Sequence, residues 1–97
     1  MVVGISVFEL HLPQARSLKD KRRVVRRLVE RIGQRHRVSV YESDYHDLHQ
    51  RAEIALAMIG PNHNDVSRVL DRVRDLVELE GDCLLTYWDP QLLETGG

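Results

Sequence analysis

The chain has few of the residues on which disulfides, metal cages and membrane anchors depend. Its 97 residues include one cysteine, Cys83, so a disulfide within the chain and a multi-cysteine metal site are both excluded. Such sparing use of cysteine is typical of a reducing compartment, and we expect a cytoplasmic protein. The apolar start is interrupted at Glu9 and follows no basic region, so we predict neither a signal peptide nor a membrane span.

Arrangements of catalytic residues are also lacking. No Ser–His–Asp or Cys–His pattern is evident, and Cys83 lies in an apolar segment as an ordinary small core residue. We therefore predict no enzyme activity, no catalytic residue and no cofactor. His46 and His49 lie in an acidic connector that could hold a divalent metal, but short motifs of this kind are weak evidence. The interpretation we favour is a solvated polar loop without a metal site.

Hydropathy patterning predicts six elements in the order βαββαβ. The expected strands cover residues 2–12, 38–45, 51–59 and 83–88, and the expected helices cover residues 18–35 and a second segment between Asn62 or Asn64 and Gly81. The first strand is apolar on both sides, which is typical of a central strand, and residues 38–45 fit an edge strand. The pattern indicates an α+β ferredoxin-like plait, with a four-stranded antiparallel sheet and two helices on one face. We expect one domain over residues 1–90 and a flexible tail over residues 91–97.

Charge is present in quantity, and its distribution is strongly uneven. Formal net charge is −1, yet residues 16–37 hold ten Lys or Arg against two acids, a net +8. Residues 38–97 hold four Arg against twelve acids, a net −8, and Glu9 supplies the remaining −1. Within the first helix, Lys19, Arg23, Arg27, Arg31 and Arg35 recur every four residues, a spacing at which like charges repel.

This basic ladder predicts a helix that binds a polyanion. Arginine makes bidentate contacts to phosphate, so we expect structured RNA or a ribosomal particle as the partner. The predicted nucleic-acid-binding residues are Arg16, Lys19, Arg22, Arg23, Arg26, Arg27, Arg31 and Arg35. Base stacking on the sheet is not expected, because the first strand has only Phe8 and the third has no aromatic residue.

The prediction requires that these cations lack carboxylate partners within the chain. Alternatively, acids of the second helix, such as Asp71, Asp75 and Glu78, offset a merely solvated basic face. A further alternative is a protein–protein module whose basic helix docks on an acidic partner.

Two further features ask for an explanation. Lys21 falls within the apolar arc of the first helix, where it could pass beyond the sheet edge, pair with Glu9 or pair with a carboxylate of residues 42–47. The first and last strands carry apolar residues on both sides, so the sheet face away from the helices should be apolar as well. Because exposed apolar faces usually mark interfaces, we predict a homodimer through that face.

The sequence also resembles a known family. The resemblance rests on His11-Leu12-Pro13, on the run from Ala15 to Arg23, on residues 38–40, and on Asp47-Leu48 with Gln50-Arg51-Ala52. On these motifs, which span almost the whole chain, it is similar to the YlxP-like bacterial family, also called domain of unknown function 503. The resemblance implies a ferredoxin-like fold and no established activity. Family members often lie beside genes for translation initiation and ribosome maturation factors, which implies a role related to RNA or the ribosome. The chain departs from the family at His46 and His49, where Gln and Trp are common.

Overall fold

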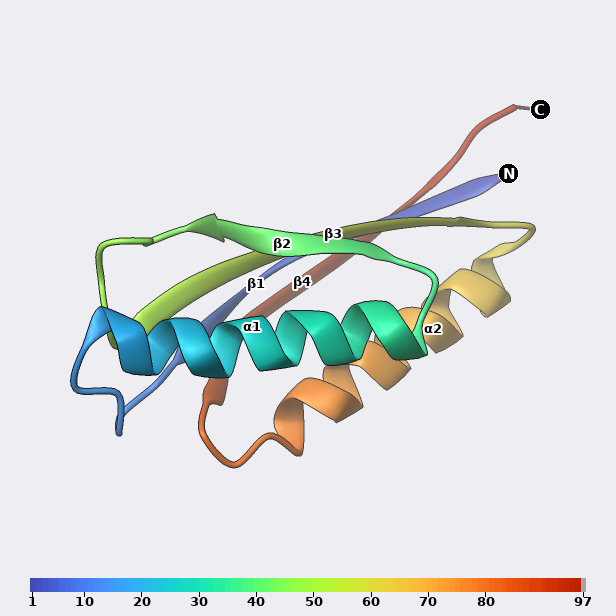
Figure 1. The fold of residues 1–97 in the computed structure, drawn as a ribbon. Coiled ribbons are helices and arrows are strands. Elements are labelled where there is room, and N and C mark those ends of the chain that lie inside the picture. Colours follow the sequence, from blue (N-terminus) through green and yellow to red (C-terminus); the bar gives the residue numbers. More distant parts are fainter. Residues whose placement is uncertain (97) are drawn as a thin grey trace.

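The computed structural model describes residues 1–96 and contains the six predicted elements in the predicted order (Figure 1). They are β1 (Val2–His11), α1 (Leu18–Arg35), β2 (Ser39–Asp44), β3 (Arg51–Gly60), α2 (His63–Glu78) and β4 (Leu84–Glu94). The strands form one antiparallel sheet in the order β2-β3-β1-β4, and both helices cover the same face of it. The α+β ferredoxin-like plait is therefore confirmed, with β1 in the centre and β2 at an edge.

Each helix begins at a residue whose side chain caps it. Ser17 Oγ accepts a hydrogen bond from the backbone N–H of Asp20 at 3.1 Å, and Asn62 Oδ1 accepts one from the backbone N–H of Asp65 at 2.9 Å. These bonds satisfy amide groups that would otherwise lack partners in the first turn. α2 ends at Glu78, with Leu79 as its cap, and so stops before the glycine that was expected to end it.

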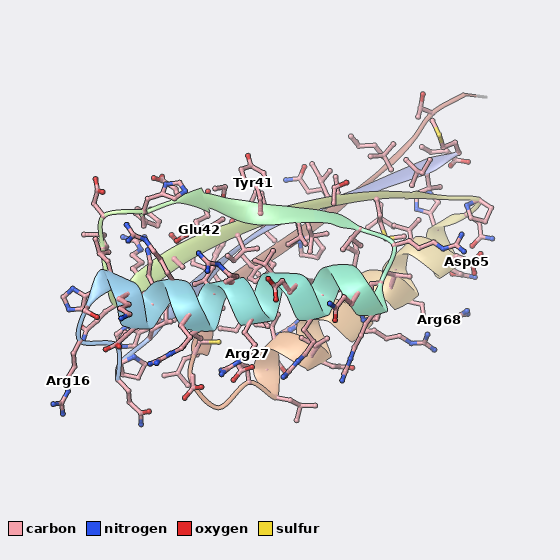
Figure 2. The ribbon with its side chains drawn as sticks, viewed as in Figure 1. Arg16, Arg27, Tyr41, Glu42, Asp65 and Arg68 are labelled. Carbon is pink, nitrogen blue, oxygen red and sulfur yellow. The ribbon has the colours of Figure 1, made fainter. Side chains whose placement is uncertain are left out.

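The core lies between the helices and the sheet. Alternate residues of β1 are buried beneath the helices, and Phe8 packs against Trp88 of β4 with ring centroids 5.3 Å apart. The opposite face of the sheet has no covering layer in the described residues. Val7, Tyr41 and Ile59 are exposed there, and Tyr41 points away from the helices (Figure 2).

The last strand is longer than predicted. A strand over residues 83–88 and a flexible tail over residues 91–97 were expected, but β4 continues to Glu94 and pairs with β1 as far as Val2. Pro90 interrupts the strand pattern in the sequence, yet it lies in an edge strand where its missing N–H need not leave a gap in the ladder. The expectation of a flexible tail is thus wrong for residues 91–94, and Gly97 lies outside the described residues.

Candidate nucleic-acid interface

The basic residues of α1 form two groups with different surroundings. One group faces the connector between α2 and β4, and the other faces solvent and the edge strand β2. This division follows from helical geometry, because residues three and four positions apart share a face of the helix. The two groups differ in whether carboxylates of the same chain already neutralise them.

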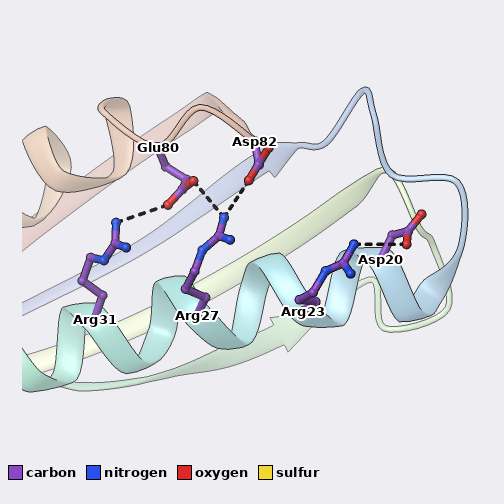
Figure 3. Close-up of polar contacts among 6 residues, drawn as sticks. All are labelled: Asp20, Arg23, Arg27, Arg31, Glu80 and Asp82. Atoms are coloured by element: carbon purple, nitrogen blue, oxygen red, sulfur yellow. Dashed lines mark hydrogen bonds and ion pairs between the residues drawn. The ribbon is translucent and has the colours of Figure 1, made fainter.

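Arg27 and Arg31 belong to the neutralised group (Figure 3). Arg27 Nη2 donates to Asp82 Oδ2 at 2.6 Å and to Glu80 Oε1 at 3.0 Å, and Arg31 Nη1 lies 3.5 Å from Glu80 Oε2. The hydrogen bond that Arg27 donates to Asp82 and the negative charge of Glu80 raise the pKa of Arg27 above its usual value. The Glu80 side chain is only 8% exposed, so this carboxylate is held between the two guanidinium groups.

Arg23 is neutralised within the first turns of α1. Its Nη2 atom lies 3.4 Å from Asp20 Oδ1, and both side chains remain open to solvent. The neutralising acids of Arg27 and Arg31 come from the connector after α2 instead of from Asp71, Asp75 or Glu78 on α2. Glu78 instead accepts from Arg74 Nε at 2.9 Å along α2.

The remaining basic residues of α1, and Arg16 just before it, have no such partners. In the described part of the chain, no carboxylate forms an ion pair with Arg16, Lys19, Arg22, Arg26 or Arg35. Lys19, Arg22 and Arg26 line an open groove of about 510 Å³ along the outer side of α1, together with Arg23, Arg27 and one acid, Glu30. Arg22 and Arg26 also border a second groove of about 340 Å³ between α1 and β2, which Glu42 lines as well.

The structure thus divides the eight predicted residues. The expectation that the ladder lacks internal neutralisation holds for Lys19 and Arg35 but is wrong for Arg23, Arg27 and Arg31 between them. The unneutralised row on α1 consists of Lys19, Arg22 and Arg26, and Arg16 precedes the helix with its side chain directed away from the fold (Figure 2). We call Lys19, Arg22 and Arg26 the free basic row.

Lys21 lies outside both groups because it is fully buried. It lies on the buried side of α1 with Val25, Leu28 and Ile32, one helical turn before Val25. Its Nζ atom forms an ion pair with Glu42 Oε2 at 2.9 Å, so of the three alternatives left open by the sequence the pairing with a carboxylate of residues 42–47 is the one observed. Lys21 Nζ also donates to the carbonyl oxygens of Tyr45 at 2.7 Å and Arg51 at 3.2 Å.

These contacts fix the connector between β2 and β3. Tyr45 has a φ of 63°, a left-handed conformation that is unfavourable for residues with a Cβ. The Arg51 guanidinium stacks 3.9 Å from the centre of the Tyr45 ring and pairs with Glu9 at 2.7 Å. The Lys21 ammonium group therefore holds backbone in place, and we assign it a structural role.

Of the two connector histidines, His46 has a backbone partner and His49 has no hydrogen-bond partner within residues 1–96. His46 Nε2 lies 3.1 Å from the backbone oxygen of Glu42. Among residues 1–96, no three His, Cys, Asp or Glu side chains are placed to hold a metal ion.

Neither helix of the described chain has the length and apolar character needed to cross a membrane.

The sequence did not reveal the two acids that neutralise Arg27 and Arg31. Glu80 and Asp82 follow α2 by two and four residues, and only the return of the chain toward β4 brings them against α1. The only sign of these acids in the sequence is that they flank Gly81 in a short connector. That signal identifies a turn but does not identify its partner.

Comparisons with known proteins agree with this fold and add no activity. The model of the family described as "Protein of unknown function (DUF503)" matches residues 3–89. The "Uncharacterized protein YlxP" of Bacillus subtilis (strain 168) is 29% identical over 91 residues, which cover 90% of this chain and 99% of that protein.

Two solved structures are similar in fold at low identity. A putative chlorite dismutase, TA0507, has a TM-score of 0.54 and 14% identity, covering 95% of this chain and 44% of that one. The chain thus spans less than half the length of that protein. The de novo designed protein Foldit4 has a TM-score of 0.53 and 11% identity, covering 99% of this chain and all of the design.

Proposed function

Since the chain belongs to the DUF503 family, whose description assigns no activity, we propose a function from the geometry of α1: a small non-catalytic module that binds structured RNA or a ribosomal particle. The free basic row is the contact surface, and Arg16 extends it at the N-terminal end. The cytoplasm, where such RNA is found, is the proposed location. The observation that carries the proposal is that Lys19, Arg22 and Arg26 line one groove, which also contains Glu30, and that none of the three forms an ion pair with a carboxylate in the described chain.

The charge arrangement favours a polyanion over a single small anion. The free basic row extends from Lys19 to Arg26, about 10 Å along the helix axis at a rise of about 1.5 Å per residue, and Arg16 precedes it, so these side chains can meet more than one phosphate. Because the helix is already folded, its backbone and Cβ atoms are fixed before binding, and less conformational entropy is lost than for a flexible basic segment. Contacts of this kind position the protein on a phosphate backbone and carry little sequence information.

Salt dependence of RNA binding tests the proposal. A fluorescently labelled RNA hairpin is titrated with the wild-type protein and with the double variant Arg22→Glu/Arg26→Glu over a range of salt concentrations. For the wild type we expect the affinity to fall with salt, because each neutralised phosphate releases counterions. The double variant should bind at least about tenfold more weakly and show a salt slope reduced by about 2.

The matched control is Arg68→Glu/Arg74→Glu, which makes the same change in net charge on α2. These arginines are exposed and each pairs with an acid of its own helix, at 3.7 Å for Arg68 and 2.9 Å for Arg74. If the surface of α1 is the site, this control loses much less affinity than the α1 variant. Equal losses in both variants, or no RNA binding by the wild type, would refute the proposal.

The open face of the sheet supports a second proposal, that two copies of the chain associate through it. Val3, Ile5 and Val7 of β1 lie on this face beside Ile59 of β3 and Leu93 of β4, as the strand registers require. The same registers place Asp89 and Gln91 opposite Val7 and Ile5, so the face combines apolar and polar side chains, and exposed apolar patches of this kind often mark an interface. A second copy presents the same apolar face, so a two-fold axis would bury it against itself.

A further inference from the structure

One edge of the sheet is uncovered at a place where the surrounding surface is basic. β2 is shorter than β3, and their pairing ends where Ser39 faces Ala57. β3 continues to Gly60, so the backbone edge of residues 58–60 has no strand partner on the β2 side in the described chain. Figure 1 shows β3 running on past the start of β2 toward α2. An unpaired strand edge offers both N–H and C=O groups to another extended chain.

Open space accompanies this edge. A groove of about 680 Å³ lies between the segment from Gly33 to Ser39 and the end of β3. Its apolar wall includes Val38, Met58 and Ile59, and Ile59 is 67% exposed. An extended peptide alternates its side chains between two faces, so an added strand can place apolar groups against one wall of this groove and carboxylates on the other side.

The rim of the groove is cationic. Arg35, His36 and Arg37 line it, and no carboxylate lies among the groove residues or forms an ion pair with either arginine in the described chain. Burial, then the positive charge of Arg72, then that of Arg35, lower the pKa of His36 below 6.5. An arriving carboxylate would therefore meet the positive charges of Arg35 and Arg37 at the rim.

We propose that this groove binds an extended acidic peptide segment, which adds as a short strand to the free edge of β3 and places carboxylates beside Arg35 and Arg37. Backbone hydrogen bonds to β3 supply the alignment, and the arginines select negative charge. The site is separate from the free basic row on α1. The inference therefore does not rest on RNA binding.

The test uses a defined probe, an eight-residue peptide of alternating Val and Glu with blocked ends, titrated into the isotopically labelled protein and followed by NMR. We expect saturable changes at the amides of residues 57–60 and at Arg37. We also expect the pKa of His36 to rise when the peptide is bound, because the bound carboxylates favour the protonated ring. A peptide with Lys in place of Glu, and one with N-methylated backbone amides, should each bind at least about tenfold more weakly.

Variants locate the site. Arg35→Glu/Arg37→Glu should lower peptide affinity at least about tenfold, whereas Arg22→Glu/Arg26→Glu, with the same charge change on the free basic row, should leave it within about twofold. Equal binding of the Lys and Glu peptides, spectral changes confined to another surface, or an RNA hairpin that occupies the groove while the peptide does not would each overturn the proposal.

Discussion

Lys21 shows how a charged residue can belong to the core. The helix presents it on the same row as buried apolar residues, and the topology provides Glu42 and two backbone carbonyls around its ammonium group. A buried charge is tolerated only when paired and hydrogen-bonded, and here both conditions are met. A helical wheel of α1 is sufficient to predict that Lys21 lies on the apolar side of the helix. The identity of its partner depends on how β2 is placed against α1.

We predict that Lys21→Met destabilises the protein strongly. The substitution removes the cation and leaves the Glu42 carboxylate and the Tyr45 carbonyl without their partner. The loss in the free energy of unfolding should be about 3–5 kcal/mol, measured by urea denaturation. Lys19→Met, at an exposed position of the same helix, is the matched control and should change stability by less than about 0.5 kcal/mol.

A second variant separates the loss of charge from the loss of shape. Lys21→Met/Glu42→Gln removes both charges together and should regain part of the stability lost in the single variant. A Lys21→Met protein as stable as the wild type would contradict the structural role assigned to this lysine.

Cys83 is predicted to be unreactive in the folded protein. It is 4% exposed, and burial together with the charges of Glu80 and Asp82 raises the pKa of its thiol to about 11. Because the thiolate is the reactive form, only about one thousandth of the thiol is ionised at pH 8. Alkylation by iodoacetamide at pH 8, followed by mass spectrometry, should be slow for the folded chain and fast in concentrated urea. Equal rates in the two conditions would show that Cys83 is accessible.

At the scale of elements, the close approach of α2 to the sheet depends on two glycines. A Cβ built on Gly4 of β1 would lie 2.5 Å from Val66 Cγ1, and one on Gly60 of β3 would lie 2.7 Å from Val66 Cγ2. Neither distance is tolerated by real side chains, so the first turns of α2 rest directly on the backbone of two strands. Glycine is needed at both positions because of this contact.

We therefore expect Gly4→Ala to destabilise the fold by about 1–3 kcal/mol in thermal or urea denaturation, as overpacking does. Gly81→Ala is the matched control, because a Cβ at Gly81 meets nothing within 4 Å, and its effect should be near zero. The double variant Gly4→Ala/Val66→Ala should recover part of the loss if the clash with Val66 is its cause. Gly4→Ala at wild-type stability would mean that α2 is less closely packed than described.

Local signals in the sequence identify most of the elements. Ser17 and Asn62 mark helix starts by their chemistry, and the apolar content of β1 on both sides marks it as central. β4 was underestimated because Pro90 and Asp89 look like a strand end. Only the sheet order reveals that Pro90 lies on an outer strand, where it is harmless. The same limit applies to the candidate site, since Glu80 meets Arg27 across 53 residues of sequence.

At the scale of the whole molecule, the opposite charges of the two sequence segments are partly matched inside the fold. The basic segment faces acids of the second half at Arg27 and Arg31 and leaves the free basic row exposed. The helices cover one face of the sheet, so the basic surface and the open apolar face lie on opposite sides of it (Figure 1). A dimer through the open face would therefore present two basic surfaces pointing away from each other, which could contact two segments of one large RNA.

The size of the open face sets the expected strength of that dimer. Three strands of about ten residues and the shorter β2, spaced about 4.8 Å apart, give a face of about 600 Å² per copy, near the lower end of specific interfaces. Analytical ultracentrifugation should therefore show a concentration-dependent equilibrium between monomer and dimer. Val7→Lys places a charge at a 39% exposed position of the central strand and should weaken the dimer at least about tenfold.

Leu79→Lys is the matched control for this experiment. Leu79 is 86% exposed, caps the C-terminal end of α2 and lies outside the sheet face, so its replacement should leave the dimer unchanged. Tyr41→Lys, at a 63% exposed position of the edge strand, provides a second test that does not depend on how β1 tolerates lysine. Wild-type protein that stays monomeric at high concentration, or dimers equally weakened by all three substitutions, would exclude the open face as the dimer interface, because only a specific sheet contact distinguishes Val7 and Tyr41 from Leu79.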